Sequence, residues 1–286
     1  MKIIKNYKKV TSNKITKKNL ILLQEKLYSG IFHQIHSPDQ FRKSLRKDSM
    51  NMDRTKYLIV MAGGSGTRMG APVPKQFMSL DGAPVMQKTI WRFVQAVPDI
   101  KIVTVLPAEY VQMWKDLCYK YSFDVPQTIV HGGLTRFHSV RNGLVKVPEG
   151  AVVAVHDGVR PFVSPGLVEK LFRMAGGLPA VVPAVPCTDT LRPVARDEAG
   201  ELVRLASEPP VDRSRVYAVQ TPQVFWSEVL KNAYGQAYDT SFTDDASVVE
   251  KAGVEVVYTD GERNNIKLTT PEDMRLAEAL CRILDY

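Results

Sequence analysis

From residue 57 to the C-terminus, short apolar runs alternate with amphipathic helical patterns. A short apolar run that ends at glycine or proline is typical of a buried strand, whereas apolar residues spaced three and four apart are typical of a helix. The strands expected from these runs are residues 57–61, 101–106, 128–130, 151–155, 180–185 and 254–258. The helices expected between them are about 85–95, 109–121, 135–147, 166–174, 227–238, 244–252 and 271–283. This order predicts an α/β fold with a Rossmann-like, mostly parallel sheet and helices on both faces.

One segment, about residues 187–219, interrupts the alternation. It is rich in arginine, proline and acidic residues and contains only short strand-like pieces such as Glu201–Leu205. A long irregular segment inside a compact domain is usually functional. We therefore expect a protruding β-arm that reaches a partner subunit, with a surface loop as the alternative.

The N-terminal residues 1–54 differ from the rest in charge. They hold 13 Lys and Arg against 4 Asp and Glu, whereas residues 55–286 hold 25 against 26. The net charge of +8 therefore comes from the N-terminal segment, so nucleic-acid binding by the folded part is not expected. We expect a disordered or non-native extension before a domain at 55–286, with a targeting peptide as the alternative.

The cysteines and the apolar runs indicate a compartment. Cys118, Cys187 and Cys281 lie far apart and form no C-x-x-C pair, which suits a reducing compartment such as the cytoplasm. No apolar run is long enough to span a membrane.

A glycine-rich loop follows the first expected strand, within Met61–Gln76 (MAGGSGTRMGAPVPKQ). Gly63, Gly64 and a third glycine let backbone N–H groups approach a phosphate closely. Arg68 and Lys75 add two cations that can neutralise charge on a transferring phosphoryl group. Ligands of such sheets bind beyond the carboxyl ends of the strands, so we expect a phosphate site here.

Other glycine-loop templates do not fit this loop. The dinucleotide fingerprint requires a glycine where Met69 stands, and the Walker A loop requires Gly-Lys-Ser or Gly-Lys-Thr, which is absent. An NAD-dependent oxidoreductase is therefore a disfavoured alternative.

The loop pattern Ala-Gly-Gly-x-Gly-x-Arg-Met-(x)5-Lys-Gln resembles that of nucleotidyltransferases that act on a sugar or alcohol phosphate. Four further motifs follow in order: Val155–Pro161 (VHDGVRP), Thr221–Gln223 (TPQ), Phe242–Ser247 (FTDDAS) and Asn265–Asp273 (NIKLTTPED). Together the five motifs resemble those of the 2-C-methyl-D-erythritol 4-phosphate cytidylyltransferases, from about residue 56 to the C-terminus.

This resemblance implies a reaction. CMP would pass from CTP to 2-C-methyl-D-erythritol 4-phosphate, giving 4-diphosphocytidyl-2-C-methyl-D-erythritol and pyrophosphate for isoprenoid precursor synthesis. Mg²⁺ would be the cofactor, held mainly by the CTP phosphates, with Asp157 as a candidate ligand. The attacking phosphate is already anionic, so no general base is required.

The resemblance also implies site residues. The implied catalytic residues are Arg68, Lys75, Arg213 and Lys267. The implied substrate-binding residues are Ala62, Gly63, Gly64, Gly133, Ser139, Asp157, Thr190 and Thr243. In this scheme Gly133 and Ser139 contact cytosine, and Arg213 acts in the site of the partner in a homodimer.

Two departures from the family pattern concern the acceptor. Asp157–Arg160 reads Asp-Gly-Val-Arg where the family often has Asp-Ala-Ala-Arg, and Leu134 stands where an acidic residue is frequent. The related ribitol-5-phosphate cytidylyltransferases commonly have Asp-Ser-Val-Arg at this position. A ribitol-5-phosphate cytidylyltransferase is therefore the alternative within the same class.

Overall fold

The computed structural model describes residues 54–63, 73–205, 209 and 211–284. The chain divides into two units, Met1–Asn51 and Met52–Tyr286. The first unit lies outside the described residues, so the expected N-terminal extension at 1–54 stays a prediction.

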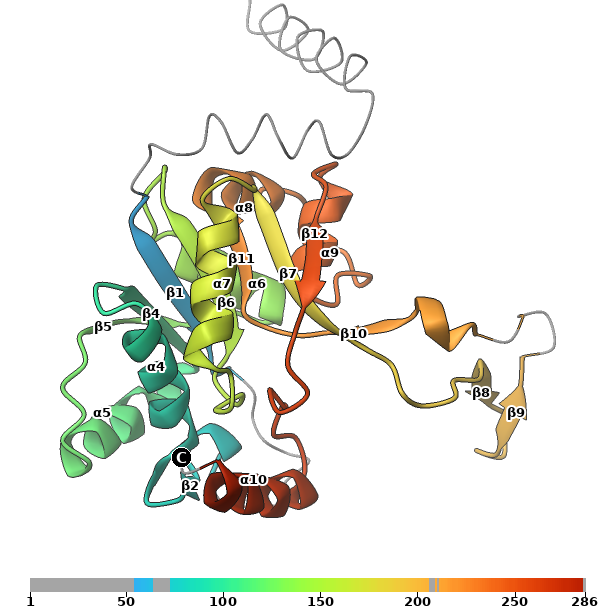
Figure 1. The fold of residues 1–286 in the computed structure, drawn as a ribbon, viewed down its shortest axis with the longest axis horizontal. Coiled ribbons are helices and arrows are strands. Elements are labelled where there is room, and N and C mark those ends of the chain that lie inside the picture. The colour runs from blue at the N-terminus through green and yellow to red at the C-terminus, as the bar shows by residue number, and fades with distance from the viewer. Residues whose placement is uncertain (1–53, 64–72, 206–208, 210, 285–286) are drawn as a thin grey trace, which may run out of the picture. The chain divides into compact units, whose positions relative to one another are not determined.

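A central sheet of eight strands organises the described part of the second unit (Figure 1). The strands are β1 (Lys56–Met61), β4 (Lys101–Leu106), β5 (Gln127–His131), β6 (Val152–Asp157), β7 (Ala180–Pro186), β10 (Tyr217–Val219), β11 (Gln223–Trp226) and β12 (Val257–Asp260). β1 pairs in parallel with β4 and β6, and two further parallel pairs are β4 with β5 and β7 with β12. The mostly parallel sheet expected from the sequence is confirmed.

Two of these strands were not expected from the sequence. β11 lies between β6 and β7 and is antiparallel to both, and β10 is antiparallel to β7. β11 begins with the buried Gln223. Gln220 and Thr221, which lie shortly before the strand, are also polar and buried. Because only three apolar residues, Val224 to Trp226, follow these polar ones, no apolar run of strand length marks this part of the sheet.

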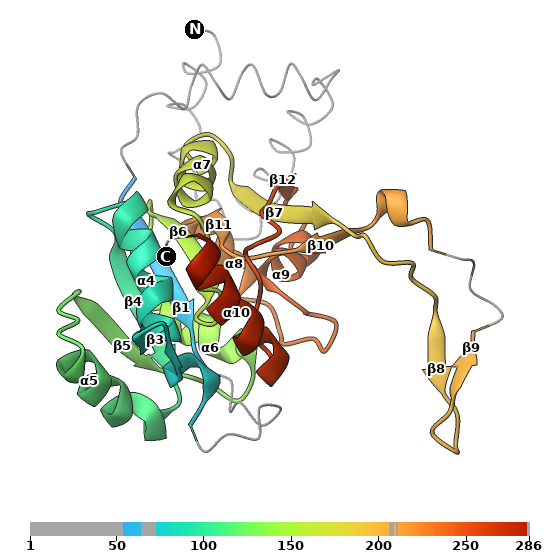
Figure 2. The ribbon, with the colours of Figure 1, turned by 60° about the horizontal axis from the view of Figure 1, so that its bottom comes forward.

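Helices cover both faces of the sheet, as Figures 1 and 2 show. On one face, α4 (Val85–Ala96), α5 (Val111–Lys120) and α7 (Pro165–Ala175) pack in one apolar core. On the other face, α6 (Arg136–Leu144), α8 (Ser227–Ala233) and α9 (Asp245–Lys251) pack in a second core. Side-chain caps fix where several of them begin, since Ser164 caps α7 and Asp244 forms a capping box with Ser247 at α9.

The last helix, α10 (Pro271–Ile283), packs away from these two cores. It contacts a small hairpin of β2 (Ser79–Leu80) and β3 (Ala83–Pro84) through a third apolar cluster, which also contains Leu268. This cluster places the strand-like run around Lys267 next to the residues that follow the glycine-rich loop.

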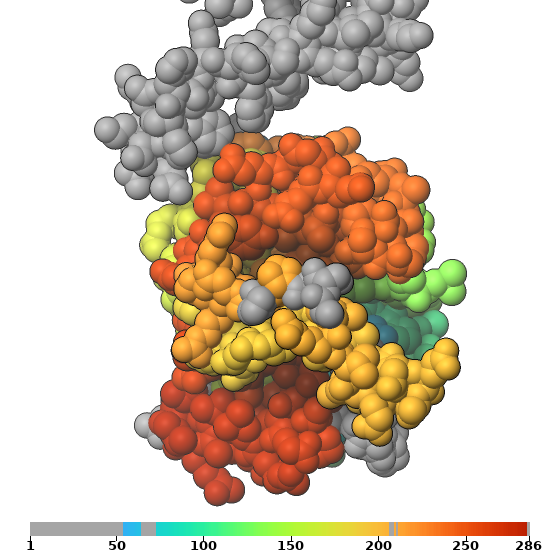
Figure 3. Space-filling view, turned by 90° about the vertical axis from the view of Figure 1, so that its right-hand side faces the viewer, coloured from blue at the N-terminus to red at the C-terminus, as the bar shows by residue number. Residues whose placement is uncertain are grey.

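The segment expected as an arm contains a short antiparallel hairpin of β8 (Val194–Arg196) and β9 (Leu202–Arg204). The hairpin pairs with no strand of the central sheet, and Figure 2 shows that the ends of β7 and β10 lead to it. In Figure 3 the atoms of this part of the chain, in yellow and orange, lie on the face toward the viewer. A single turn, η4 (Arg213–Arg215), precedes β10. The role of this segment in dimerisation stays a prediction.

Several expected boundaries differ from the structure. The helix expected at 227–238 ends at Ala233, and the strand expected at 254–258 is β12 at Val257–Asp260. Gly235 lies just beyond the end of α8, and Gly253 has a φ of +83° before β12. Glycine at such positions ends or turns an element, so the apolar pattern alone overextends it. None of the helices in the described ranges combines the length and the apolarity needed to cross a bilayer.

Arg54 anchors the beginning of the described domain. Its guanidinium lies 2.8 Å from the Glu228 carboxylate and 4.4 Å from the centre of the Trp226 ring. The side chain of Arg54 is only 10% exposed, so this contact is better shielded than an ordinary surface ion pair.

We predict that a chain beginning at Met52 unfolds at the same temperature as the full chain, because it keeps Arg54. Changing Arg54 to alanine in that shorter chain should lower the free energy of unfolding by about 1 kcal/mol. Thermal unfolding measures the first effect, and urea unfolding measures the second. Arg275→Ala is the control, because Arg275 and its partner Glu272 are 71% and 69% exposed and should contribute little. A large loss of stability on truncation alone would show that the domain needs the upstream residues.

Candidate active site

Three loops meet at the carboxyl edge of the sheet. The parallel register pairs Met61 at the end of β1 with Asp157 at the end of β6. The backbone N–H of Gly158 donates to the Met61 carbonyl at 2.8 Å, and the N–H of Gly132, after β5, donates to the Leu106 carbonyl at 2.8 Å. One backbone bond therefore holds the start of the glycine-rich loop to the loop after β6, which contains Asp157 and is called here the His-Asp loop. The other holds the start of the loop before α6 to the end of β4.

The glycine-rich loop is tied at both of its described ends. The Gln76 side chain donates from Nε2 to the Ala62 carbonyl at 2.9 Å. Phe77 packs on Trp114 with ring centres 6.2 Å apart, and Lys75 is 9% exposed. These contacts fix the position of the segment Lys75–Phe77, which follows the loop in the chain. The implied site residues Gly64 and Arg68 lie outside the described residues.

The loop before α6 is organised around Ser139. Its Oγ accepts from the Gly133 N–H at 2.9 Å and donates to the Thr135 carbonyl at 2.9 Å. A Cβ added to Gly63 would lie 4.0 Å from the same Oγ. The structure thus brings together Gly63, Gly133 and Ser139, which the resemblance assigned to one nucleotide.

Asp157 lies between two cations. Its Oδ2 is 3.0 Å from Lys267 Nζ and 3.2 Å from Arg160 Nε. Burial raises the pKa of Asp157, but the charges of Lys267, Arg136 and Arg160 outweigh that effect and hold the pKa well below its usual range. The carboxylate is therefore ionised at neutral pH, and its ion pair joins the loop after β6 to Lys267, an implied catalytic residue.

His156 precedes Asp157 in the chain and is not among the implied site residues. Its Nδ1 is 2.9 Å from Thr221 Oγ1, and its Nε2 is 3.2 Å from the Arg160 carbonyl oxygen. Burial is the main cause that lowers its pKa to about 3, so the ring is neutral. The motifs VHDGVRP and TPQ contain His156, Arg160 and Thr221, but nothing in their spacing shows that the side chains meet.

A buried ion pair joins α6 to α9. Arg136 donates from both terminal nitrogens to the Asp245 carboxylate, at 2.8 and 2.6 Å, and Tyr234 Oη donates to Asp245 Oδ1 at 2.5 Å. Burial lowers the pKa of Arg136, but Asp245 more than offsets it and the pKa is raised. Asp245 is 0% exposed whereas the Arg136 side chain is 32% exposed, so removing Arg136 would leave a buried carboxylate without its cation.

Three further implied site residues do not contact the cluster of Asp157 and Lys267 within one chain. Thr190, Arg213 and Thr243 are exposed, and Arg213 donates to the Thr188 carbonyl at 3.3 Å. Within the described ranges, no hydrogen bond or ion pair links these three residues to Asp157 or Lys267.

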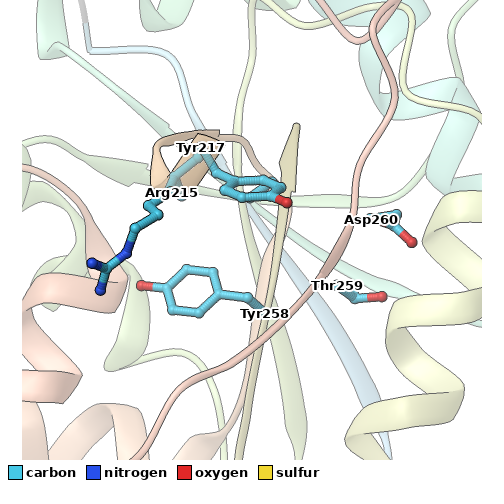
Figure 4. A pocket seen from close by; sticks show the side chains of 7 residues that line it. Arg215, Tyr217, Tyr258, Thr259 and Asp260 are labelled. Atoms are coloured by element: carbon cyan, nitrogen blue, oxygen red, sulfur yellow. The ribbon is translucent and has the colours of Figure 1, made fainter. Parts of the chain in front are cut away.

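A cavity of about 630 Å³ lies between β10 and β12. Figure 4 shows the side chains of Arg215, Tyr217 and Tyr258 directed to this hollow. Tyr258 Oη donates to Glu250 Oε1 at 2.9 Å, and burial together with Glu250 raises the pKa of Tyr258 to about 12. Tyr217 and Tyr258 are nevertheless 51% and 50% exposed, so much aromatic surface remains uncovered.

The described residues define an α/β protein in which the start of a glycine-rich loop leaves the sheet beside a carboxylate flanked by two cations. The family model of 2-C-methyl-D-erythritol 4-phosphate cytidylyltransferase (IspD) matches residues 57–283. The chain belongs to this family.

Relatives and solved structures agree with that membership. The chain is 48% identical over 230 residues to the 2-C-methyl-D-erythritol 4-phosphate cytidylyltransferase of Porphyromonas gingivalis, covering 80% of this chain and 99% of the relative. It is 44% identical over 228 residues to that of Azobacteroides pseudotrichonymphae, with 79% and 99% covered. The crystal structure of the Thermus thermophilus enzyme has a TM-score of 0.59 at 29% identity, with 81% and 100% covered. The 4-diphosphocytidyl-2C-methyl-D-erythritol synthase of Anaerococcus prevotii has a TM-score of 0.64 at 29% identity, with 80% and 96% covered.

We predict that Gly133→Ala destabilises the protein by about 1–3 kcal/mol, because overpacking costs this much. The added methyl would lie 2.5 Å from the Cβ of His138 and 3.1 Å from its carbonyl carbon. Chemical unfolding measures the change.

The matched control is Gly166→Ala in the first turn of α7. A Cβ there would lie 3.7 Å from Ser164 Oγ, an ordinary contact. Alanine is also the better helix former, so stability should stay the same or rise slightly. Equal losses in the two variants would show that Gly133 is not closely packed.

Proposed function

We propose that the chain transfers CMP from CTP to 2-C-methyl-D-erythritol 4-phosphate and releases pyrophosphate, in isoprenoid precursor synthesis. The observation that carries the proposal is the ion pair of Asp157 with Lys267 at the end of β6, opposite Met61, after which the glycine-rich loop begins, within a family match over residues 57–283. One edge of the sheet thus presents both a phosphate-binding backbone and an anion-binding lysine.

The nucleotide half of the site uses backbone groups. In this proposal Ala62, Gly63 and Gly64 bind the CTP phosphates and base through their main chain, and Gly133 and Ser139 contact cytosine. Asp157 lies by the ribose and the metal-bound phosphates. Hydrogen bonds from these main-chain groups would orient the α-phosphate for in-line attack.

The reaction needs charge neutralisation more than proton transfer. An oxygen of the acceptor phosphate bonds to the α-phosphorus of CTP while the bond from that phosphorus to the bridging oxygen breaks, and pyrophosphate leaves. Arg68 and Lys75 would stabilise the charge on the crowded phosphorus. Lys267, Thr190 and Thr243, with Arg213 from a partner, would hold the acceptor.

The proposed cofactor is Mg²⁺. The described residues hold no group of three or more His, Cys, Asp or Glu side chains that could form a metal site. Asp157 supplies one nearly buried carboxylate, which fits Mg²⁺ bound by one carboxylate together with substrate phosphates. When bound, the ion would neutralise part of the charge of the phosphates.

The proposed assembly is a homodimer that works in the cytoplasm. Arg213 lies in the segment between β7 and β10 and contacts only exposed surface of its own chain among the described residues. The neighbouring cavity leaves Tyr217 and Tyr258 half exposed, as expected for a surface that a second copy covers. Arg213 would then enter the site of the partner.

The identity of the acceptor can be tested directly. Pyrophosphate release with CTP should be much faster with 2-C-methyl-D-erythritol 4-phosphate than with ribitol 5-phosphate at equal concentrations. Faster release with ribitol 5-phosphate would favour the related enzyme. Protection against thermal unfolding by CTP with Mg²⁺, and none by NAD or NADH, would exclude the oxidoreductase.

Sharing of Arg213 between subunits predicts complementation. Arg213→Ala and Lys75→Ala chains should each be nearly inactive, but one site of each mixed dimer would be intact. An equimolar mixture should therefore recover about a quarter of wild-type turnover, because half of the dimers are mixed. A mixture with no recovered turnover, although mixed dimers form, would place Arg213 in the site of its own chain.

A further inference from the structure

His156 is a completely buried imidazole that the proposed chemistry does not use. Its exposed fraction is 0%, and it packs on Phe93 with ring centres 4.9 Å apart. A buried polar side chain with two satisfied nitrogens has a directional role in addition to packing. Both of its bonds lead to the turn of residues 157–160.

The chemistry of the partners fixes the direction of each bond. The Arg160 carbonyl oxygen can only accept, so His156 Nε2 carries the hydrogen. In the neutral ring Nδ1 is then the acceptor, so the Thr221 hydroxyl donates to it. The same hydroxyl oxygen accepts from the Asp157 N–H at 3.1 Å. A single arrangement of hydrogens satisfies all three contacts.

These contacts hold both ends of the turn that carries the carboxylate. Through Thr221, the ring fixes the backbone of Asp157 at the start of the turn. Through the Arg160 carbonyl, it fixes the end, where the N–H of Arg160 also donates to the Asp157 carbonyl at 3.1 Å. Arg160 in turn donates to Asp157 Oδ2 and, at 2.8 Å, to the Asn265 carbonyl.

We propose that His156 is a positioning residue, which in its neutral Nε2–H form locks the turn of residues 157–160 and so aims the Asp157 carboxylate at the nucleotide. The inference rests on the proposed function for the role of Asp157. His156 transfers no proton in this proposal, because the ring is buried and a positioning role needs no contact with a ligand.

Two conservative variants separate the two bonds of the ring. The His156→Asn amide can replace Nδ1 as an acceptor for Thr221, whereas the His156→Gln amide can replace Nε2 as a donor to Arg160. Each variant loses one tie and should turn over about tenfold more slowly than the wild type, as expected for one net hydrogen bond of about 1.4 kcal/mol. His156→Leu, which loses both ties, should lose more than either.

A double-variant comparison tests whether His156 acts through Thr221. His156→Gln should cause no further loss of turnover in a Thr221→Val background, because the bond between the two residues is already absent. Thr104→Val is the matched control. Its buried hydroxyl donates to Gln127 Oε1 at 2.7 Å, outside the site, so it should lower stability without changing turnover by more than about twofold.

The tautomer gives a readout that packing alone would not produce. In ¹⁵N-labelled wild-type protein at neutral pH, the His156 signal, assigned by its loss in His156→Gln, should show a hydrogen on Nε2 and none on Nδ1. A hydrogen on Nδ1, additive losses in the double variant, or unchanged turnover of folded His156→Gln would each overturn the inference alone. A wild-type protein without turnover on either acceptor would overturn the proposed function, and the positioning role with it.

Discussion

The parallel pairing of β1 with β6 is the constraint on which the site depends. Its register places Met61 beside Asp157, so the glycine-rich loop and the His-Asp loop leave the sheet at neighbouring points. A slip of one residue would turn every side chain of β6 to the opposite face, so that Val152 and Ala154 would exchange cores with Val153 and Val155 and the close packing of both cores would be lost. Burial of the apolar core therefore sets the position of the carboxylate relative to the phosphate-binding backbone.

Much of this arrangement could be predicted from the sequence, because apolar runs and glycine loops are local signals. The strands β1, β4 and β6 coincide closely with the apolar runs at 57–61, 101–106 and 151–155. The rule that ligands lie beyond the carboxyl ends of parallel strands then places Gly63, Gly133 and Asp157 at one edge, where the structure has them. The roles of these residues stay predictions.

The remainder could not be predicted because it depends on polar residues that are buried through distant partners. Gln223 lies within a strand, and its amide bonds to the Asp244 carboxylate and the Ala246 N–H, about twenty residues along the chain. A hydropathy pattern assigns such a residue to the surface. In the same way Arg136 and Asp245 look like solvated charges in the sequence, whereas in the fold Asp245 is completely buried against Arg136, so removing Arg136 would cost about 3–5 kcal/mol.

The segment that contains the hairpin of β8 and β9 begins after β7 and ends at β10. These two strands pair with each other, since Val185 of β7 lies opposite Ala218 of β10. The segment therefore leaves and rejoins the sheet at one place, so its length can change without moving any other strand of the sheet. The segment can be lengthened, shortened or changed in sequence while the edge of the sheet that carries the proposed nucleotide site stays intact. If the segment completes the site of a neighbouring copy, the geometry of assembly can diverge between relatives while the catalytic core remains the same.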